Sequence, residues 1–308
     1  MATIVYGHPD CLTHVTTPGH PECVDRLHAV DRGLAGLPVI REKAPLAPED
    51  EVLRCHPPAY LAKVRRAVPA EGWVALDGDT LLSPGSLNAA LRAVGGIVAA
   101  VDAVMAGQAQ NAFIAARPPG HHAETATAMG FCLFGTVAIA AKRLLDHHGL
   151  SRVAIVDFDV HHGNGTQDLL WDEARILFAS THQMPLYPST GSAAERGAHG
   201  QILNHPLRPG TGSAAMRAAY DQHILPALDA YAPEFILISA GFDAHEADPL
   251  ASLNWQTADY AWLTRRLCDI ADAHAQGRIV STLEGGYDLP ALQASVAAHV
   301  GVLEERGR

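Results

Sequence analysis

The sequence predicts an α/β fold in which a mainly parallel sheet lies between helices on both faces. Short apolar segments rich in β-branched residues alternate with longer helical segments along the chain, which is typical of repeated strand-helix units. Glycine- and proline-rich segments separate them. With 308 residues, 48% of them apolar, the chain can bury a full core. We therefore expect residues 1–308 to form a single domain.

The strands are predicted from short, uninterrupted apolar runs, which are typical of strands buried on both faces. The clearest example is Val153-Ala154-Ile155-Val156, which directly precedes a polar segment. By the same pattern we expect strands at residues 3–6, 111–116, 153–156, 176–179, 235–238 and 278–283.

The helices are predicted between these strands. Residues 86–105 are the longest candidate, because this segment is rich in Ala, Leu and Val and carries only Arg92 and Asp102 as charges. Gly95 and Gly96 within it indicate either the close approach of another backbone or a kink. Further helices are expected from Cys23, from His56, and at residues 132–148, 214–230, 257–273 and 289–303.

Charge and composition limit the classes of partner. The net charge of −11 argues against a basic groove for nucleic acid, and an acidic surface either attracts cationic substrates or only keeps the protein soluble. Five cysteines without a CxxC pair argue against disulfides and thiolate zinc sites. The first residues do not resemble a signal peptide, and we expect no run long enough to span a bilayer. These observations predict a cytoplasmic protein, and a homo-oligomer stays open.

Residues 157–167 are the segment around which a site is predicted. They place two carboxylates and two imidazoles just after an apolar run. Side chains two apart on an extended chain share a face, so Asp159 and His161 can converge on one ion while Asp157 points elsewhere. Gly163 and Gly165 allow a tight turn beyond the strand end, which is where open α/β sheets bind ligands.

Other predicted strand ends carry the groups that would complete this site. The carboxyl ends of parallel strands meet at one edge, which would bring the pair His121 and His122 together with Asp243 and Tyr287. Taken singly, each residue has an ordinary explanation as a cap, a turn or a loop surface. Together they form a hydrolase site, in which Asp159, His161 and Asp243 would hold one zinc ion with positions open for water and substrate.

The remaining polar groups suggest how such a site would move protons. His121 or His122 would be the general base. Asp157 could hydrogen-bond one imidazole and favour its charged form, whereas the neutral Asn164 could orient the other without raising its pKa as much. Tyr287 would donate its hydroxyl to the oxyanion, an interaction worth about 3 to 4 kcal/mol.

At these residues the chain resembles the histone deacetylase family, within the arginase/deacetylase superfamily. The match extends over almost the whole chain, and Asn164 resembles the class II branch, including bacterial histone deacetylase-like amidohydrolases. The motifs stand in the family's order: Arg117-Pro118-Pro119-Gly120-His121-His122, Gly130-Phe131-Cys132, Asp157 to Gln167, Gly241-Phe242-Asp243 and Glu284-Gly285-Gly286-Tyr287.

This resemblance implies the arginase-like three-layer αβα fold and one catalytic zinc ion on Asp159, His161 and Asp243. It implies that His122 is the general base and acid, with His121 as its electrostatic partner. It also implies a structural potassium ion beneath the zinc, for which Asp157, Asp159, Ser180 and the main chain near His161 are the matching positions.

The resemblance further implies a narrow acyl-lysine tunnel. Phe131 and Tyr187 match its two aromatic walls, and Gly130, Leu250 and Gly286 are expected to bind substrate with them. Tyr187 departs from the family, where phenylalanine is common, and its hydroxyl either contacts an acyl group or points to solvent. A leucine at position 250 resembles lysine deacetylases more than polyamine-selective members. Gly135 also departs, because the family commonly carries a polar residue there.

These observations predict a zinc-dependent amidohydrolase whose substrate is an acetyl-lysine peptide or a small acylated amine. An acetylpolyamine or other small-molecule deacylase of the same fold is the nearest alternative. A dinuclear manganese ureohydrolase would need further carboxylates to bridge a second metal. The non-enzyme alternative is a module that binds acylated ligands without hydrolysing them.

Overall fold

A single eight-stranded sheet organises the protein. The structure is a computed structural model that describes residues 2–307. The strand order is β2-β1-β5-β10-β9-β6-β7-β8, and every neighbouring pair in it is parallel. The strands are β1 (Thr3–Gly7), β2 (Ile40–Lys43), β5 (Asn111–Ile114), β6 (Val153–Asp157), β7 (Ile176–Gln183), β8 (Ile202–Leu207), β9 (Phe235–Ala240) and β10 (Ile279–Leu283).

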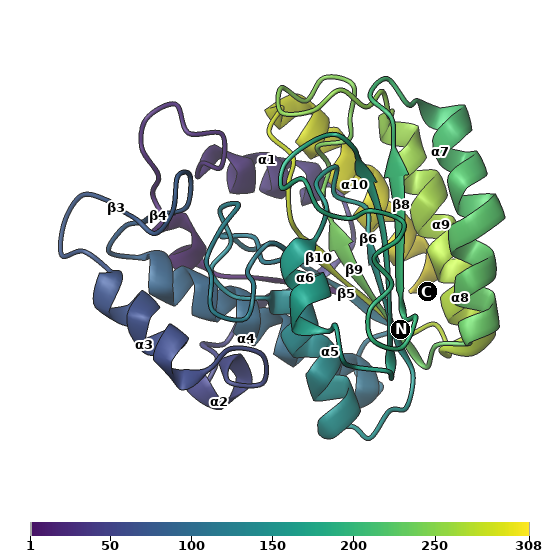
Figure 1. The fold of residues 1–308 in the computed structure, drawn as a ribbon, viewed down its shortest axis with the longest axis horizontal. Helices are drawn as coiled ribbons and strands as arrows, with labels where there is room; N and C mark the ends of the chain where they lie inside the picture. The colour runs from purple at the N-terminus through teal and green to yellow at the C-terminus, as the bar shows by residue number, and fades with distance from the viewer. Residues whose placement is uncertain (1, 308) are drawn as a thin grey trace.

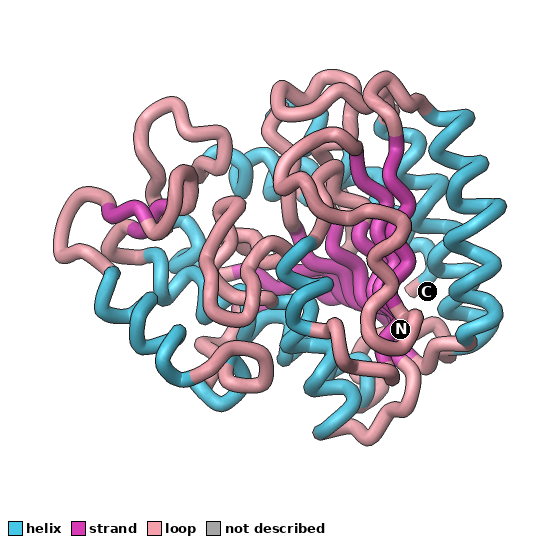
Figure 2. Tube along the Cα trace, in the orientation of Figure 1, coloured by secondary structure: helices cyan, strands magenta, loops and turns pink. Residues whose placement is uncertain are grey.

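Helices cover both faces of this sheet, so the predicted three-layer αβα arrangement is confirmed (Figure 1). On one face α1, α10, α9 and α8 pack side by side, and on the other α4 packs against α5. Figure 2 shows the strands in the middle of the molecule, with long loops at their ends. The helices are α1 (Asp25–Leu34), α2 (Glu49–Val52), α3 (Pro58–Ala67), α4 (Ser86–Met105), α5 (Thr136–Asp146), α6 (Asn164–Leu169), α7 (Ser213–Ala219), α8 (Leu225–Tyr231), α9 (Thr257–His274) and α10 (Leu289–Arg306), with a 3-10 turn at Pro9–Leu12 and a π-helical turn at Tyr220–Ile224.

The strands predicted from apolar runs all occur, and those at the centre of the sheet are buried along their whole length. The two strands of this sheet that the sequence did not predict, β2 and β8, are its edges. All four residues of β2 are exposed. In β8 the run of apolar residues is interrupted by Asn204, His205 and Pro206. Edge strands need neither a continuous apolar run nor a full set of backbone donors, so their sequences carry no clear strand pattern. The short β3 (Val74–Ala75) and β4 (Leu81–Leu82) form a separate hairpin.

The predicted helix at residues 132–148 begins later than expected, at Thr136. Gly130 and Phe131, just before the predicted start, have positive φ angles of 54° and 69°, and Gly135 has a ψ angle of 73°, which is outside the helical region. The loop that replaces the first helical turn runs past the site described below.

Helix α4 corrects one expectation. Residues 86–105 are long and apolar enough to cross a membrane by length and composition, contrary to the expectation that no such run exists. In the structure, 67% of its apolar window is buried inside the protein. A core helix packed on a sheet passes the same test of length and composition, since both environments favour apolar side chains.

Gly95 lets another backbone approach α4. A Cβ atom built on Gly95 would lie 2.0 Å from the carbonyl oxygen of Pro45 and 2.9 Å from the nitrogen of Ala47. The helix continues without interruption from Ser86 to Met105. Of the two explanations that the sequence allows, close backbone approach is therefore the correct one for Gly95.

Gly95→Ala is expected to lower the free energy of unfolding by about 1 to 3 kcal/mol, because the new Cβ would meet backbone atoms that cannot rotate away. Gly301→Ala in α10 is the control. Its Cβ would meet only a side-chain carbon of Leu37 at 3.8 Å, so helix propensity should raise its stability by up to about 1 kcal/mol. Urea unfolding measures the free energies of unfolding of the two variants. Equal values would contradict the close backbone packing at Gly95.

Candidate active site

The site forms where four neighbouring strands end. The strands β5, β10, β9 and β6 are adjacent in the sheet and parallel. Their carboxyl ends therefore bring together four segments that are distant in sequence: residues 117–122, 284–287, 241–243 and 157–164. This is the edge at which the sequence predicted a site.

Three buried side chains converge at this edge. One ligand atom from each of Asp159, His161 and Asp243 lies within 4.8 Å of the other two. His161 Nδ1 is 3.1 Å from both Asp159 Oδ1 and Asp243 Oδ2. Burial alone would lower the pKa of His161, but these hydrogen bonds and the two carboxylate charges raise it to about 10. The three side chains therefore favour a positive charge at the point where they meet.

The donor set fits a metal ion. Within residues 2–307, no lysine or arginine forms an ion pair with Asp159 or Asp243. Their other partners include the backbone N–H groups of Gly285, at 2.8 Å from Asp159, and of Val160, at 2.9 Å from Asp243. His121 Nε2 also lies 3.7 Å from Asp159 Oδ2. Buried carboxylates are costly unless paired or bound to a metal, and two oxygens with one imidazole nitrogen are ligands that zinc accepts.

Two glycines make the room that these carboxylates occupy. A Cβ on Gly241 would lie 2.1 Å from Asp159 Oδ2, and a Cβ on Gly285 would lie 2.0 Å from Asp243 Oδ2. Each glycine follows the end of a central strand, β9 or β10. A side chain at either glycine would displace the carboxylate of Asp159 or Asp243. Both glycines are therefore needed for the site to form.

A second group of ligand atoms does not fit a metal. Asp102, His147 and His148 also bring ligand atoms within 4.8 Å of one another. However, the guanidinium of Arg143 donates to both oxygens of Asp102, at 2.8 and 2.7 Å. That carboxylate already has its cation, and the group is partly exposed.

The two adjacent histidines have different partners. His121 Nδ1 lies 3.0 Å from Asp157 Oδ2, and His122 Nδ1 lies 2.7 Å from Asn164 Oδ1. Burial opposes the charge on His121, but Asp159 and Asp157 outweigh it and raise its pKa well above the usual value. Burial, together with the charges of His121 and His161, holds the pKa of His122 well below the usual value. The pairing that the sequence left open is thus Asp157 with His121 and Asn164 with His122.

The residues matched to a potassium site also lie side by side. Asp157 ends β6 and is paired in register with Ser180 of β7. Asp157 Oδ1 accepts the N–H of Asp159 at 3.1 Å, and Ser180 Oγ lies 2.9 Å from His182 Nδ1. Burial raises the pKa of Asp157 to about 6.

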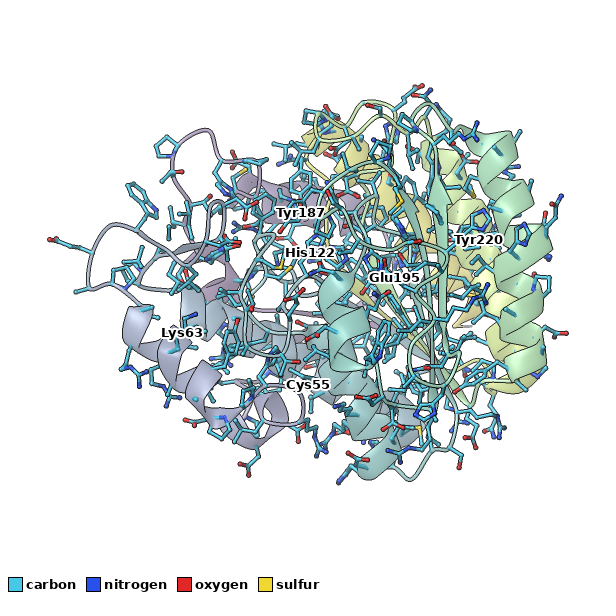
Figure 3. The ribbon with its side chains drawn as sticks, in the orientation of Figure 1. Cys55, Lys63, His122, Tyr187, Glu195 and Tyr220 are labelled. Atoms are coloured by element: carbon cyan, nitrogen blue, oxygen red, sulfur yellow. The ribbon has the colours of Figure 1, made fainter. Side chains whose placement is uncertain are left out.

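A cavity of about 270 Å³ opens onto His122, His161 and Tyr287. Tyr187 and His122 lie close together at the centre of Figure 3, with ring centroids 5.3 Å apart and the rings nearly perpendicular. Tyr187 is 38% exposed, and Gly286, also expected to bind substrate, is not among the lining residues. The lining residues are Pro21, Asp79, His122, Gly130, Phe131, His161, Leu186, Tyr187, Leu250 and Tyr287.

Comparison with known proteins now adds the family. A model described as the histone deacetylase domain matches residues 20–303. The chain belongs to the histone deacetylase family. A probable deacetylase of Archaeoglobus fulgidus is 39% identical to it, covering 94% of this chain and 82% of that one. A histone deacetylase-like amidohydrolase of Pseudomonas aeruginosa is 41% identical, covering 79% and 65%. The crystal structure of the HDA15 HD domain matches with a TM-score of 0.92 at 33% identity, covering 98% and 90%, consistent with the arginase-like fold.

One departure from the family pattern has a structural reason. A Cβ on Gly135 would lie 2.2 Å from Leu169 Cδ1. The N–H of Gly135 also donates to His56 Nε2 at 2.9 Å. A side chain at this position would therefore require the end of the Leu169 side chain on α6 to shift, whereas glycine leaves that side chain in place.

Glu284 supports the histidine pair, although no role was predicted for it from the sequence. Its Oε2 accepts the N–H groups of Gly120 at 2.7 Å and His121 at 3.2 Å, and Ser239 donates to its Oε1 at 3.2 Å. Burial raises its pKa to about 7. An acidic residue directly after a predicted strand was the available signal.

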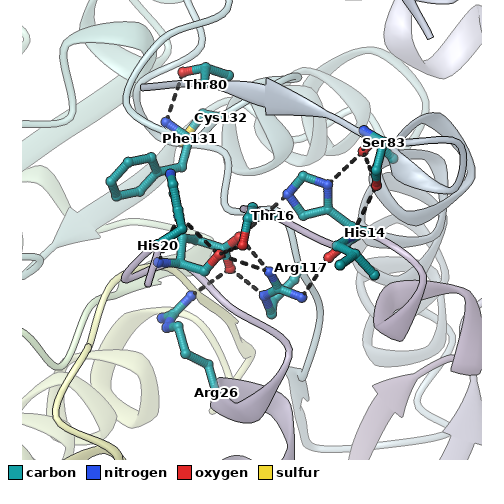
Figure 4. Close-up of polar contacts among 12 residues, drawn as sticks. His14, Thr16, His20, Arg26, Thr80, Ser83, Arg117, Phe131 and Cys132 are labelled. Atoms are coloured by element: carbon teal, nitrogen blue, oxygen red, sulfur yellow. Dashed lines mark hydrogen bonds and ion pairs between the residues drawn. The ribbon is translucent and has the colours of Figure 1, made fainter. Parts of the chain in front are cut away.

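A buried charge network holds the opposite side of the site, and the sequence did not predict it either (Figure 4). Glu22 pairs with both Arg117 and Arg26, and His14 Nε2 lies 3.3 Å from it. Arg26 donates to the carbonyl of Gly286 at 2.7 Å, and its guanidinium carbon lies 4.9 Å from the ring centre of Tyr287. The network therefore links the first loop of the chain to the loop that carries Tyr287.

Glu22→Gln is expected to lower the free energy of unfolding at pH 7 by about 3 to 5 kcal/mol, because it leaves two buried guanidinium groups without their carboxylate. Although burial opposes it, the charge of Arg117 and the hydrogen bond from His14 lower the pKa of Glu22 below its usual value of 4.5. The ion pairs of Glu22 with Arg117 and Arg26 thus stabilise the fold fully above about pH 4.5. They cease to do so as the pH falls further and Glu22 becomes protonated. The deficit of the variant should shrink in acid.

Urea unfolding at several pH values measures this dependence. The control is Glu49→Gln, which removes an exposed pair with Arg65 and should cost about 1 kcal/mol or less at every pH. A deficit for Glu22→Gln as small as that of the control would contradict the assigned network.

Proposed function

We propose that the protein is a zinc-dependent deacylase that hydrolyses the amide of an acylated amine, with acetyl-lysine as the leading substrate type. The observation that carries the proposal is the placement of the buried Asp159, His161 and Asp243 group beside His122 and Tyr287, with His122, His161 and Tyr287 lining one cavity. Two relatives are described as a probable deacetylase and a histone deacetylase-like amidohydrolase, which supports the same class of reaction.

Asp159, His161 and Asp243 would hold the zinc ion. A bound zinc ion supplies positive charge that acidifies water and polarises a carbonyl group. With three protein ligands, positions stay open for water and substrate, as a catalytic site needs. We also propose that Asp157 and Ser180 contribute to a structural potassium site, since they are neighbours on β6 and β7.

His122 would move the proton. Its lowered pKa keeps the imidazole neutral at pH 7, and Asn164 holds its Nδ1, so Nε2 is the nitrogen that can take a proton from water in the cavity. The same nitrogen would return the proton to the leaving amine. His121, paired with Asp157, would stay protonated and act through its charge.

Tyr287 would stabilise the oxyanion. Burial raises the pKa of this phenol well above its usual value of 10, so the hydroxyl keeps its proton and can donate it in a hydrogen bond. Phe131, Tyr187 and Leu250 line the same cavity and would contact the alkyl chain of the substrate.

An acetylpolyamine is the second candidate substrate. Among the residues that line the cavity, Asp79 carries the acidic side chain. Its carboxylate would attract a second amine on the substrate. Hydrolysis of a panel of acetyl-lysine peptides, acetylpolyamines and longer acyl chains separates the two candidates.

Tyr287→Phe is expected to lower kcat about 10²- to 10³-fold on an acetyl-lysine peptide, because one oxyanion donor is lost. Zinc content and melting temperature should stay unchanged. Tyr231→Phe is the matched control, since this partly buried tyrosine lies outside the cavity. The proposed function fails if zinc-loaded protein hydrolyses no member of the panel, or if Tyr287→Phe is as active as the control.

Zinc removal is expected to abolish hydrolysis, and one zinc ion per chain should restore it. His161→Ala should bind far less zinc because it loses one of three ligands. His205→Ala is the control, since His205 stacks on His223 away from the cavity. Metal analysis after dialysis measures the ratio, and two manganese ions per chain would favour the ureohydrolase alternative.

A further inference from the structure

We propose that Asp248 is a positioning residue for Tyr287. Its carboxylate fixes the backbone of Tyr287 and also holds Leu250 in the cavity wall. This inference rests on the proposed function, in which the Tyr287 hydroxyl stabilises the oxyanion. Asp248 lies in the loop between β9 and α9, and it is 7% exposed.

Both oxygens of Asp248 accept backbone hydrogen bonds. Oδ2 accepts the N–H of Tyr287 at 2.6 Å and that of Asp288 at 3.3 Å. Oδ1 accepts the N–H of Leu250 at 3.0 Å. Burial and the charge of Asp243 raise the pKa of Asp248 to about 7. Above that pH the carboxylate is ionised, and its bonds to backbone N–H groups are charge-assisted and about twice as strong as neutral ones.

The bond to Leu250 alone would be an ordinary local turn, because an aspartate often accepts the N–H two residues later. The bonds to Tyr287 and Asp288 join residues 39 and 40 positions apart, and a local turn does not explain them. Within residues 2–307, Asp248 forms no ion pair with lysine, arginine or histidine. Its carboxylate is therefore dedicated to these two loops.

The loop that carries Tyr287 needs such an anchor. It contains Gly285 and Gly286, and Gly286 has a φ angle of 121°, a conformation that glycine adopts but other residues rarely do. Asp159 holds the N–H of Gly285, and Arg26 holds the carbonyl of Gly286. Asp248 holds the N–H of the residue that bears the phenol.

Leu250 and Tyr287 line the same cavity from different loops. Asp248 therefore couples the wall that would contact the alkyl chain to the group that would contact the oxyanion. A displacement of about 1 Å in a reacting group can cost about 10²-fold in rate, so loss of this anchor should appear mainly in kcat.

A double-mutant cycle on the zinc-loaded full chain tests this inference. Asp248→Ala is expected to lower kcat about 10- to 100-fold on an acetyl-lysine peptide. In the Tyr287→Phe background the same change should lower kcat less than threefold, because the hydroxyl that Asp248 positions is already absent. If the two effects instead multiply, Asp248 acts independently of the phenol, and the inference is overturned.

Asp288→Ala is the matched control. This aspartate follows Tyr287, and its side chain caps α10 by accepting the N–H of Ala291 at 2.9 Å. Its loss should lower the melting temperature and leave kcat unchanged. A loss of kcat equal to that of Asp248→Ala would mean that any loosening of this loop slows the reaction, and it would overturn the specific role of Asp248.

Asp248→Asn is the conservative variant, because its amide keeps one acceptor oxygen. Its kcat should lie between those of the unsubstituted protein and Asp248→Ala, and it serves in the cycle if the alanine variant loses zinc or unfolds. An asparagine variant with kcat as low as alanine at full zinc content would overturn the inference. Absence of hydrolysis by the unsubstituted protein, or a Tyr287→Phe variant with unchanged kcat, would instead refute the proposed function.

Discussion

The burial of negative charge at one edge of a parallel sheet is the constraint on which the rest of the structure depends. Asp157, Asp159, Asp243 and Glu284 are each at most 1% exposed, and uncompensated burial of such groups costs several kcal/mol apiece. Three kinds of partner compensate for this burial. Asp157 faces a histidine with a raised pKa, and Glu284 accepts two backbone N–H groups. Asp159 and Asp243 share His161, which leaves room for a cation.

The same constraint explains the loops around the edge. Backbone must come close to a carboxylate to donate to it, and a side chain at Gly241 or Gly285 would occupy the place of a ligand oxygen. The resulting loops are glycine-rich and would be mobile alone. Charged side chains from remote parts of the chain hold them, and Arg26 is an example because it donates to the Gly286 carbonyl. Precision in this site therefore comes from tethers outside the loops themselves.

This division also explains what the sequence could and could not reveal. Central strands such as β6 and β9 are buried on both faces, so their apolar runs show their positions, and parallel pairing then brings His121, Asp159, Asp243 and Tyr287 to one edge. Edge strands such as β2 lack that pattern. Glu284, Arg26 and Asp248 bind main-chain groups. Every residue has a main-chain carbonyl, and nearly every residue has a main-chain N–H, so the sequence does not show which residue is the partner. The sequence also could not decide which imidazole faces Asp157, because His121 and His122 are adjacent in a loop and residue order does not show how their side chains are oriented.

The groups proposed for the chemistry and those proposed for substrate choice differ in how they are held. Asp159, His161, Asp243 and His122 lie beyond strand ends and are at most 8% exposed, so a change in any of them disturbs buried polar groups that are hydrogen-bonded to one another or to neighbouring residues. Tyr187, 38% exposed, lies on a loop of the cavity wall, and a substitution there alters packing without leaving a charge unpaired. Substrate choice can thus diverge while the reaction is retained. Family membership therefore indicates the class of reaction more strongly than the identity of the amine.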